Sequence, residues 1–150
     1  MRLVIQRVQE AELKIEGVVY SSIGPGMLVL LGIEEEDNDE DLNFLVQKLA
    51  GMRIFSDEEG KMNLDIKQVN GEIMIVSQFT LHASTKKGNR PSFIKAARPE
   101  KAIPLYEKFI IETEKALGKH CKTGQFGADM KITLVNDGPV TILMDSKNRE

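Results

Sequence analysis

The sequence predicts an α+β fold, a single domain over residues 1–150 in which twisted, mostly antiparallel β-sheets form a barrel-like core with two packed helices. Three observations predict it: most segments have the composition of strands, two have helical spacing, and the two kinds do not alternate as βαβ units would. A chain of 150 residues can bury about 70% of the surface that its unfolded form exposes, so one domain needs no disulfide or metal for stability.

Three strands are expected in the first third of the chain. Residues 2–8 and 11–17 have the pattern of two strands, and the second alternates apolar and charged residues. Residues 27–33 follow a Gly-Pro-Gly turn and contain no polar residue, so both faces of this strand are expected to be buried.

Two amphipathic helices are expected. The first begins at Asp39 and ends at Gly51, and the second begins near Pro99 or Pro104 and ends before Gly118. Helical spacing predicts that their apolar faces consist of Leu42, Leu45, Val46 and Leu49 in the first helix and Leu105, Phe109, Thr113, Ala116 and Leu117 in the second.

The remaining strands flank a long polar loop. An Asn-Gly turn at 70–71 starts a strand that is expected to end near Thr80, and the loop then continues to about Pro99. Residues 128–136 and 140–145 have the pattern of two further strands. The sequence Asn-Asp-Gly-Pro at 136–139 interrupts them, and a strand that breaks and resumes at once calls for a functional reason.

Composition favours a protein of the reducing cytoplasm. Cys121 is the only cysteine, so it cannot form an internal disulfide. The N-terminal apolar run, residues 3–5, is far too short for a signal peptide or a membrane span. We therefore expect a soluble, cytoplasmic protein with no membrane partner.

Charge is distributed unevenly along the chain. The 20 basic and 23 acidic residues argue against a protein that coats nucleic acid indiscriminately. Residues 34–41 include seven acids, whereas residues 82–101 include one acid and six basic residues, which could attract phosphate. Charge runs of this kind are more often simply solvated loops. The basic residues are Lys86, Lys87, Arg90, Lys95, Arg98 and Lys101.

The sequence lacks the usual catalytic motifs. It contains no GxSxG, GxxxxGK, CxxC or GxGxxG motif, and its two histidines, His82 and His120, do not have the spacing of a zinc site. No metal and no cofactor are expected. Ser77, Gln78 and Thr80 place hydrogen-bonding groups at the end of a strand, although they could simply satisfy the backbone of the following loop.

Six segments of the sequence are informative when taken together: IQRV at 5–8, GMRIFSDEEGKMNLDI at 51–66, SQFTL at 77–81, GNRPSF at 88–93, TGQFGADM at 123–130 and NDGPVT at 136–141. With these segments, the chain resembles the D-aminoacyl-tRNA deacylases of the bacterial and eukaryotic type, often called D-tyrosyl-tRNA deacylases. The intact SQFTL segment favours the branch specific for D-amino acids over the paralogue that edits a different mischarged tRNA.

The resemblance implies a homodimer with active sites at the subunit interface. In this family the Gly-Pro of the NxGPxT motif, here Asn136 with Gly138 and Pro139, is joined by a cis peptide bond and inserted into the partner's active site. Arg7 matches the residue that orients this motif. The strand is thus expected to break in order to present rigid backbone carbonyls that exclude L-amino acids. Glycine has no side chain to exclude, so glycyl-tRNA is expected to be hydrolysed as well.

The substrate implied is the ester of a D-amino acid with the terminal ribose of tRNA, and its hydrolysis is a chiral proofreading reaction. Backbone N–H groups of Phe79 and Thr80 are candidates for stabilising the oxyanion, and the substrate's own 2′-hydroxyl for activating water. Phe126 and Met130 match residues around the terminal adenosine, although Met130 could equally be a core residue.

Two alternatives stay open. Thr80 could be a nucleophile with His82 as its base, since the two side chains would share one face of a continuing strand. The protein could instead be a non-catalytic tRNA-binding module that contacts phosphates through Lys86, Lys87 and Arg90.

Overall fold

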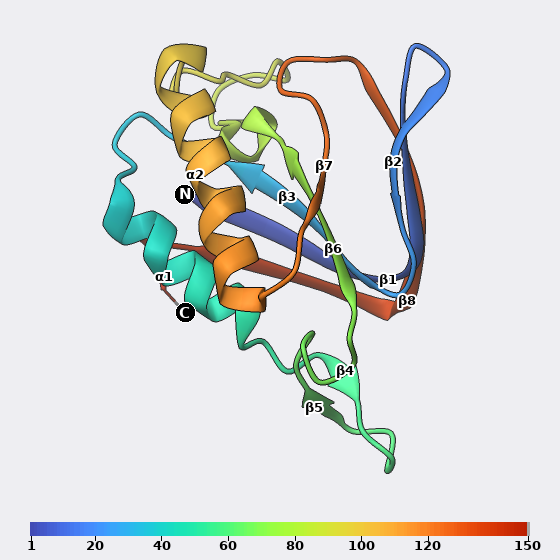
Figure 1. Cartoon of the computed structure of the whole chain (residues 1–150). Coiled ribbons are helices and arrows are strands. Elements are labelled where there is room, and N and C mark those ends of the chain that lie inside the picture. Colours follow the sequence, from blue (N-terminus) through green and yellow to red (C-terminus); the bar gives the residue numbers. More distant parts are fainter. Residues whose placement is uncertain (150) are drawn as a thin grey trace.

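The structure, a computed structural model, describes residues 1–149 (Figure 1). Its longest elements are two paired strands, β1 (Arg2–Ile15) and β8 (Met130–Asp145). β1 is one strand of 14 residues, so the expectation of separate strands at 2–8 and 11–17 is wrong. Register shifts between Gln6 and Glu10 explain the difference, because such irregularities bend a strand without ending it.

The sheet curves until its edges nearly meet. The other edge of β1 pairs with β3 (Gly26–Gly32) and then with β2 (Val18–Ile23), and every pair made by β1 is antiparallel. β6 (Glu72–Ser77) and β7 (Lys122–Thr123) extend the sheet from β3 as parallel strands. The Ser21 hydroxyl of β2 donates to the Thr123 carbonyl of β7 at 2.8 Å, which links the two edges. The barrel-like, mostly antiparallel α+β fold is therefore confirmed.

Two helices cover one side of the sheet, and the short hairpin of β4 (Phe55–Ser56) and β5 (Met62–Leu64) projects away from it (Figure 1). α1 (Asp39–Ala50) begins after Asn38, whose side chain accepts from the N–H groups of Glu40 and Asp41. All four residues predicted for its apolar face are buried. Within residues 1–149, no helix is both long and apolar enough to span a membrane.

α2 (Pro99–Leu117) begins at the first of the two prolines considered and is followed by Gly118, whose φ of 66° is left-handed. Its buried residues are Ala102, Tyr106, Phe109 and Thr113. Leu105 and Leu117 are half-buried, and Ala116 is exposed, so the prediction for Ala116 is wrong. Phe109 and Thr113 are buried as predicted, and the buried stripe also includes Ala102 and Tyr106, which were not predicted.

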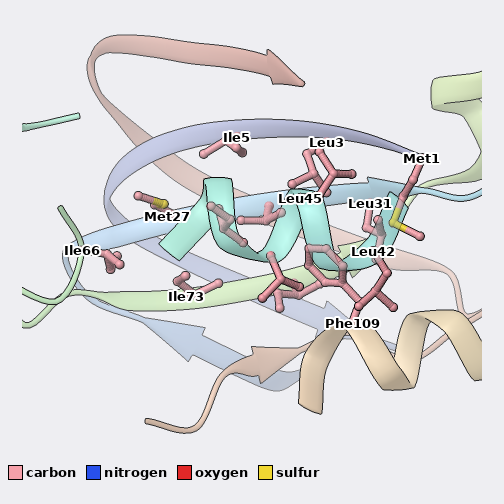
Figure 2. Close-up of a cluster of buried hydrophobic side chains, with 14 of the residues drawn as sticks. Met1, Leu3, Ile5, Met27, Leu31, Leu42, Leu45, Ile66, Ile73 and Phe109 are labelled. Atoms are coloured by element: carbon pink, nitrogen blue, oxygen red, sulfur yellow. The ribbon is translucent and has the colours of Figure 1, made fainter. Parts of the chain in front are cut away.

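The main core lies between the sheet and the helices, where apolar side chains of β1, β3, β6, α1 and α2 meet (Figure 2). Met27, Val29 and Leu31 of β3 belong to this cluster, whereas Leu28 faces a second cluster inside the curved sheet. Both faces of β3 are therefore buried, as its unbroken apolar sequence predicts.

The two ends of the described chain meet beside α1. The Ser146 N–H donates to the Met1 carbonyl at 2.9 Å. The α-amino group of Met1 is fully buried, pairs with the Asp37 carboxylate and donates to the Ser146 hydroxyl at 2.9 Å. Asp37 also accepts the Glu34 N–H at 2.8 Å. The two charges of this buried pair compensate each other in place of water, and the Lys147 ammonium lies 3.9 Å from the same carboxylate oxygen.

Candidate active site

The chain turns sharply after β6. β6 ends at Ser77, and η1 (Phe79–His82) is a single turn of 3₁₀ helix, so the expectation that the strand reaches Thr80 is wrong. The turn packs closely on β3: a Cβ added to Gly32 would lie 2.8 Å from the Leu81 Cβ and 3.1 Å from the Gln78 carbonyl oxygen. Glycine at position 32 therefore lets η1 sit directly against the sheet.

Two backbone amides of η1 are left for an outside acceptor. The Gln78 N–H donates to the Leu31 carbonyl at 2.8 Å and the Leu81 N–H to the Gln78 carbonyl at 3.2 Å. For the N–H groups of Phe79 and Thr80, no acceptor is found within residues 1–149. The first N–H groups of any helical turn lack partners inside it, so they can serve a ligand.

A cavity of about 330 Å³ lies beside this turn. Residues 77–79 form one part of its lining and residues 126–130 another, although some fifty residues separate them in the sequence. The fold thus brings together Ser77, Gln78, Phe79, Phe126 and Met130, all predicted as site residues. The rest of the described lining is apolar and consists of Leu31, Ile33, Val76, Ala97, Ala102 and Ile132.

Tyr106 is a supporting residue that the sequence analysis missed. Its ring packs against that of Phe126 with centroids 6.0 Å apart, and its hydroxyl donates to the Ile75 carbonyl at 2.9 Å. Burial raises the pKa of Tyr106 to about 12, so the hydroxyl stays a proton donor. A helix that begins at Pro99 places Tyr106 on one face with Ala102, Phe109 and Thr113, and this spacing is the signal that predicts its burial.

The side chains of Thr80 and His82 are not hydrogen-bonded to each other. The Thr80 hydroxyl accepts from the Gln78 amide at 2.6 Å. His82 is buried with its Nδ1 3.8 Å from a Glu34 carboxylate oxygen, and burial lowers the pKa of its ring. No hydrogen-bond partner is found for either ring nitrogen within residues 1–149. The prediction that these side chains share a strand face is wrong, because the strand ends first.

Cys121 is not a reactive thiol. Burial, with a smaller effect of Glu114, raises the pKa of the Cys121 thiol to about 12, which disfavours the thiolate. Among the described residues, no group of three or more His, Cys, Asp or Glu side chains could hold a metal ion.

The Asn-Asp-Gly-Pro sequence forms an excursion within β8, which is one strand of 16 residues, so the expectation of separate strands at 128–136 and 140–145 is wrong. Gln6 pairs with Thr141 and Val8 with Asn136, so residues 137–140 lie opposite Arg7 alone. The Asn136 side chain holds both sides of the excursion, donating to the Val140 carbonyl at 3.0 Å and accepting the Val140 N–H at 2.9 Å. The bond between Gly138 and Pro139 is cis.

Arg7 fixes the base of this excursion. Its guanidinium is buried, donates from Nε to the Asp137 carbonyl at 2.9 Å and donates from Nη1 to the Ile54 carbonyl at 2.6 Å. Gly138 and Pro139 are exposed at the tip and are not among the residues that line the cavity of their own chain. The site as found within one chain therefore lacks the predicted Gly-Pro group.

The long loop after η1 carries unpaired positive charge. Ser84 and Ser92 exchange backbone hydrogen bonds of 2.8 and 2.9 Å that close the loop. Lys86, Lys87 and Arg90 lie between them and are exposed, and within residues 1–149 no acidic partner is found for them. Lys101 differs, because its ammonium donates to the Glu35 carbonyl.

Comparisons with known proteins agree with the resemblance. The model of the family described as D-Tyr-tRNA(Tyr) deacylase matches residues 4–145. Proteins named D-aminoacyl-tRNA deacylase from Akkermansia muciniphila and Bacteroides thetaiotaomicron are each 61% identical over the full length of both chains.

Solved structures show the same fold. One described as c-Myc DNA unwinding element binding protein is 40% identical, covers 97% of this chain and 98% of its own, and superposes with a TM-score of 0.91. A probable eukaryotic D-amino acid tRNA deacylase is 20% identical, covers 95% and 97%, and has a TM-score of 0.81, which is a likeness of fold. The chain belongs to the D-Tyr-tRNA(Tyr) deacylase family.

Proposed function

We propose that this deacylase hydrolyses the ester between a D-amino acid and the terminal ribose of tRNA in the cavity beside η1, and so acts in chiral proofreading. The cavity supports the proposal, because Phe79 lines it together with residues 126–130, and Thr80, which is not in the lining, follows Phe79 directly in η1. Phe126 and Met130 suit the face of an adenine base. The volume of about 330 Å³ is in the range of small-molecule sites.

The chemistry needs no nucleophilic side chain. Water attacks the ester carbonyl, the resulting oxyanion collapses, the bond to the ribose oxygen breaks, and that oxygen takes up a proton. The N–H groups of Phe79 and Thr80 are proposed to donate to the oxyanion, a contribution of about 2.7–4 kcal/mol per donor in other acyl-transfer enzymes. The substrate's 2′-hydroxyl is proposed to activate the water.

This mechanism predicts that Thr80→Ala keeps most of the activity on D-aminoacyl-tRNA, because the variant retains the backbone N–H and loses only a hydroxyl bound to Gln78. Single-turnover deacylation, which isolates the chemical step, is the measurement. A loss of about a thousandfold with binding intact would show that the Thr80 side chain is the nucleophile.

The active site is proposed to be completed by a second copy of the chain. Val4, Gln6, Thr141 and Leu143 occupy paired positions on the outer face of β1 and β8, and Leu143 is 75% exposed. η1 lies at one end of this strip, since Arg2 Nη1 donates to the Leu81 carbonyl at 2.9 Å.

The Gly138-Pro139 excursion lies at the other end of the strip, next to Thr141. The four residue steps from Arg2 to Gln6 span about 14 Å at a rise of about 3.4 Å per residue. A two-fold axis through the middle of the strip would therefore place each excursion beside the η1 turn of the other copy. We propose that the Gly138 and Pro139 carbonyls there hold the α-amino group while their backbone excludes an L side chain.

The basic loop is proposed to contact tRNA phosphates. Neutralising Lys86, Lys87 and Arg90 together is expected to weaken tRNA binding and to reduce the slope of log affinity against log salt by about two to three units, since each phosphate contact releases counterions. Binding titrations at several salt concentrations measure this. If the triple variant keeps the wild-type slope, the loop does not touch the phosphates.

Hydrolysis distinguishes the proposed enzyme from a non-catalytic tRNA-binding module. D-tyrosyl-tRNA and L-tyrosyl-tRNA are incubated with the purified protein, and released amino acid is measured against the spontaneous rate. We expect rapid release from the D ester only. A binder would instead slow the spontaneous hydrolysis of both esters.

A further inference from the structure

An exposed aromatic pair lies at the edge of the cavity. The rings of Phe79 and Phe93 meet edge to face, with centroids 5.1 Å apart and an angle of 73° between their planes. The Phe79 side chain is 55% exposed and Phe93 is 37% exposed. Because Phe79 lines the cavity, the Phe93 ring lies next to the cavity lining, although Phe93 itself is not part of it.

The surroundings of Phe93 combine exposed apolar area with positive charge. The next residue, Ile94, is 92% exposed. In the sequence, Arg90 precedes Phe93 and Ile94, and Lys95 follows them; both basic residues are exposed. Within residues 1–149, neither of these cations has an acidic partner. Aromatic rings set in a basic surface are the usual means of binding single-stranded nucleic acid, since the bases stack and the phosphates meet the cations.

We infer that Phe93, flanked by Ile94, is a stacking surface for the unpaired nucleotide that precedes the terminal adenosine of tRNA. The inference rests on the proposed function, which puts that adenosine in the cavity against Phe126. A strand leaving the cavity past Phe79 meets Phe93 next. The edge-to-face contact fixes the orientation of the Phe93 ring.

Two substrates separate this role from a purely structural one. D-tyrosyl-tRNA contains the preceding nucleotide, whereas adenosine esterified with D-tyrosine ends at the nucleoside bound in the cavity. Phe93→Ala is expected to lower kcat/KM for D-tyrosyl-tRNA by roughly 5- to 150-fold, the range for loss of one base–aromatic stack, and to leave hydrolysis of the adenosine ester unchanged. Phe93→Tyr keeps the ring and should retain activity on both substrates.

Ile111→Ala is the matched surface control for Phe93→Ala. It removes an exposed isoleucine of α2 and should leave hydrolysis of both substrates at the wild-type rate. The salt dependence of tRNA binding should be the same for Phe93→Ala as for wild type, because stacking releases no counterions, unlike the contacts of the basic loop.

Three results would overturn the inference. An equal loss on both substrates would mean that Phe93 only supports η1, and no loss on D-tyrosyl-tRNA would mean that no base stacks there. A dimer that dissociates when Phe93 is replaced, seen by light scattering, would assign the ring to the subunit contact. Failure of the wild-type protein to cleave either substrate is a separate outcome, which rejects the proposed function and this inference with it.

Discussion

Replacing Asp37 by asparagine is expected to lower the free energy of unfolding by about 3–5 kcal/mol, the usual cost of removing one partner of a buried ion pair. The α-amino group of Met1 and the Asp37 carboxylate are both fully buried, and the ammonium would lose the carboxylate with which it pairs. The Glu34 N–H would also lose its carboxylate acceptor. Urea unfolding of the variant and of the wild type measures the change, and the slopes of unfolding free energy against urea concentration are compared.

Asp39→Asn is a matched control for this variant. Asp39 lies two residues after Asp37 and pairs with Lys108 at 2.7 Å, but the side chains of Asp39 and Lys108 are both exposed. Exposed pairs contribute about 0–1 kcal/mol, so the loss of stability should be small. If the two variants unfold at the same urea concentration, the buried pair does not hold the chain ends in place.

Gly138→Ala is expected to lower kcat/KM by about 100-fold on D-aminoacyl-tRNA and on glycyl-tRNA alike, a loss of the size caused by a 1 Å misplacement of a positioning group. An added Cβ would lie 2.6 Å from the Val140 Cγ2 and 2.7 Å from the Val140 backbone nitrogen, so the tip must move. The φ of 150° at this residue is also unfavourable for alanine. Deacylation rates of both substrates measure the effect.

Gly17→Ala separates displacement of the tip from general backbone strain. Gly17 has a φ of 78° at the turn between β1 and β2, and an added Cβ there meets nothing within 4 Å. This variant should deacylate at the wild-type rate. Activity of Gly138→Ala equal to that of Gly17→Ala would show that the excursion does not touch the substrate.

The features that the sequence predicts well are local. α1 begins and ends as predicted because its cap at Asn38, its acidic first turn and its apolar stripe all lie within one short segment. The burial of both faces of β3 follows equally from its own composition. The segments of the cavity were predicted from family motifs, and the fold brings five of the predicted residues together.

The features that the sequence does not predict depend on contacts between distant segments. The turn at Thr80 forms because the Gln78 N–H donates to the Leu31 carbonyl and because Gly32 lets the turn approach β3. The sequence of residues 77–82 alone does not indicate either contact. The continuity of β1 depends on β8, which pairs with both halves of the strand. Residue spacing alone could not reveal either arrangement.

The enzyme is proposed to select its substrates only by excluding an L side chain. Deacylation of four esters, measured side by side, tests this selection by exclusion most directly. Glycyl-, D-alanyl-, D-tyrosyl- and L-alanyl-tRNA are compared at equal concentrations of the wild-type protein. If the Gly138 and Pro139 backbone only excludes an L side chain, glycine and both D-amino acids are released at similar rates and L-alanine stays on its tRNA. If the protein cleaves D-tyrosyl-tRNA but does not cleave glycyl-tRNA at all, it recognises the D side chain itself. That result would contradict selection by exclusion.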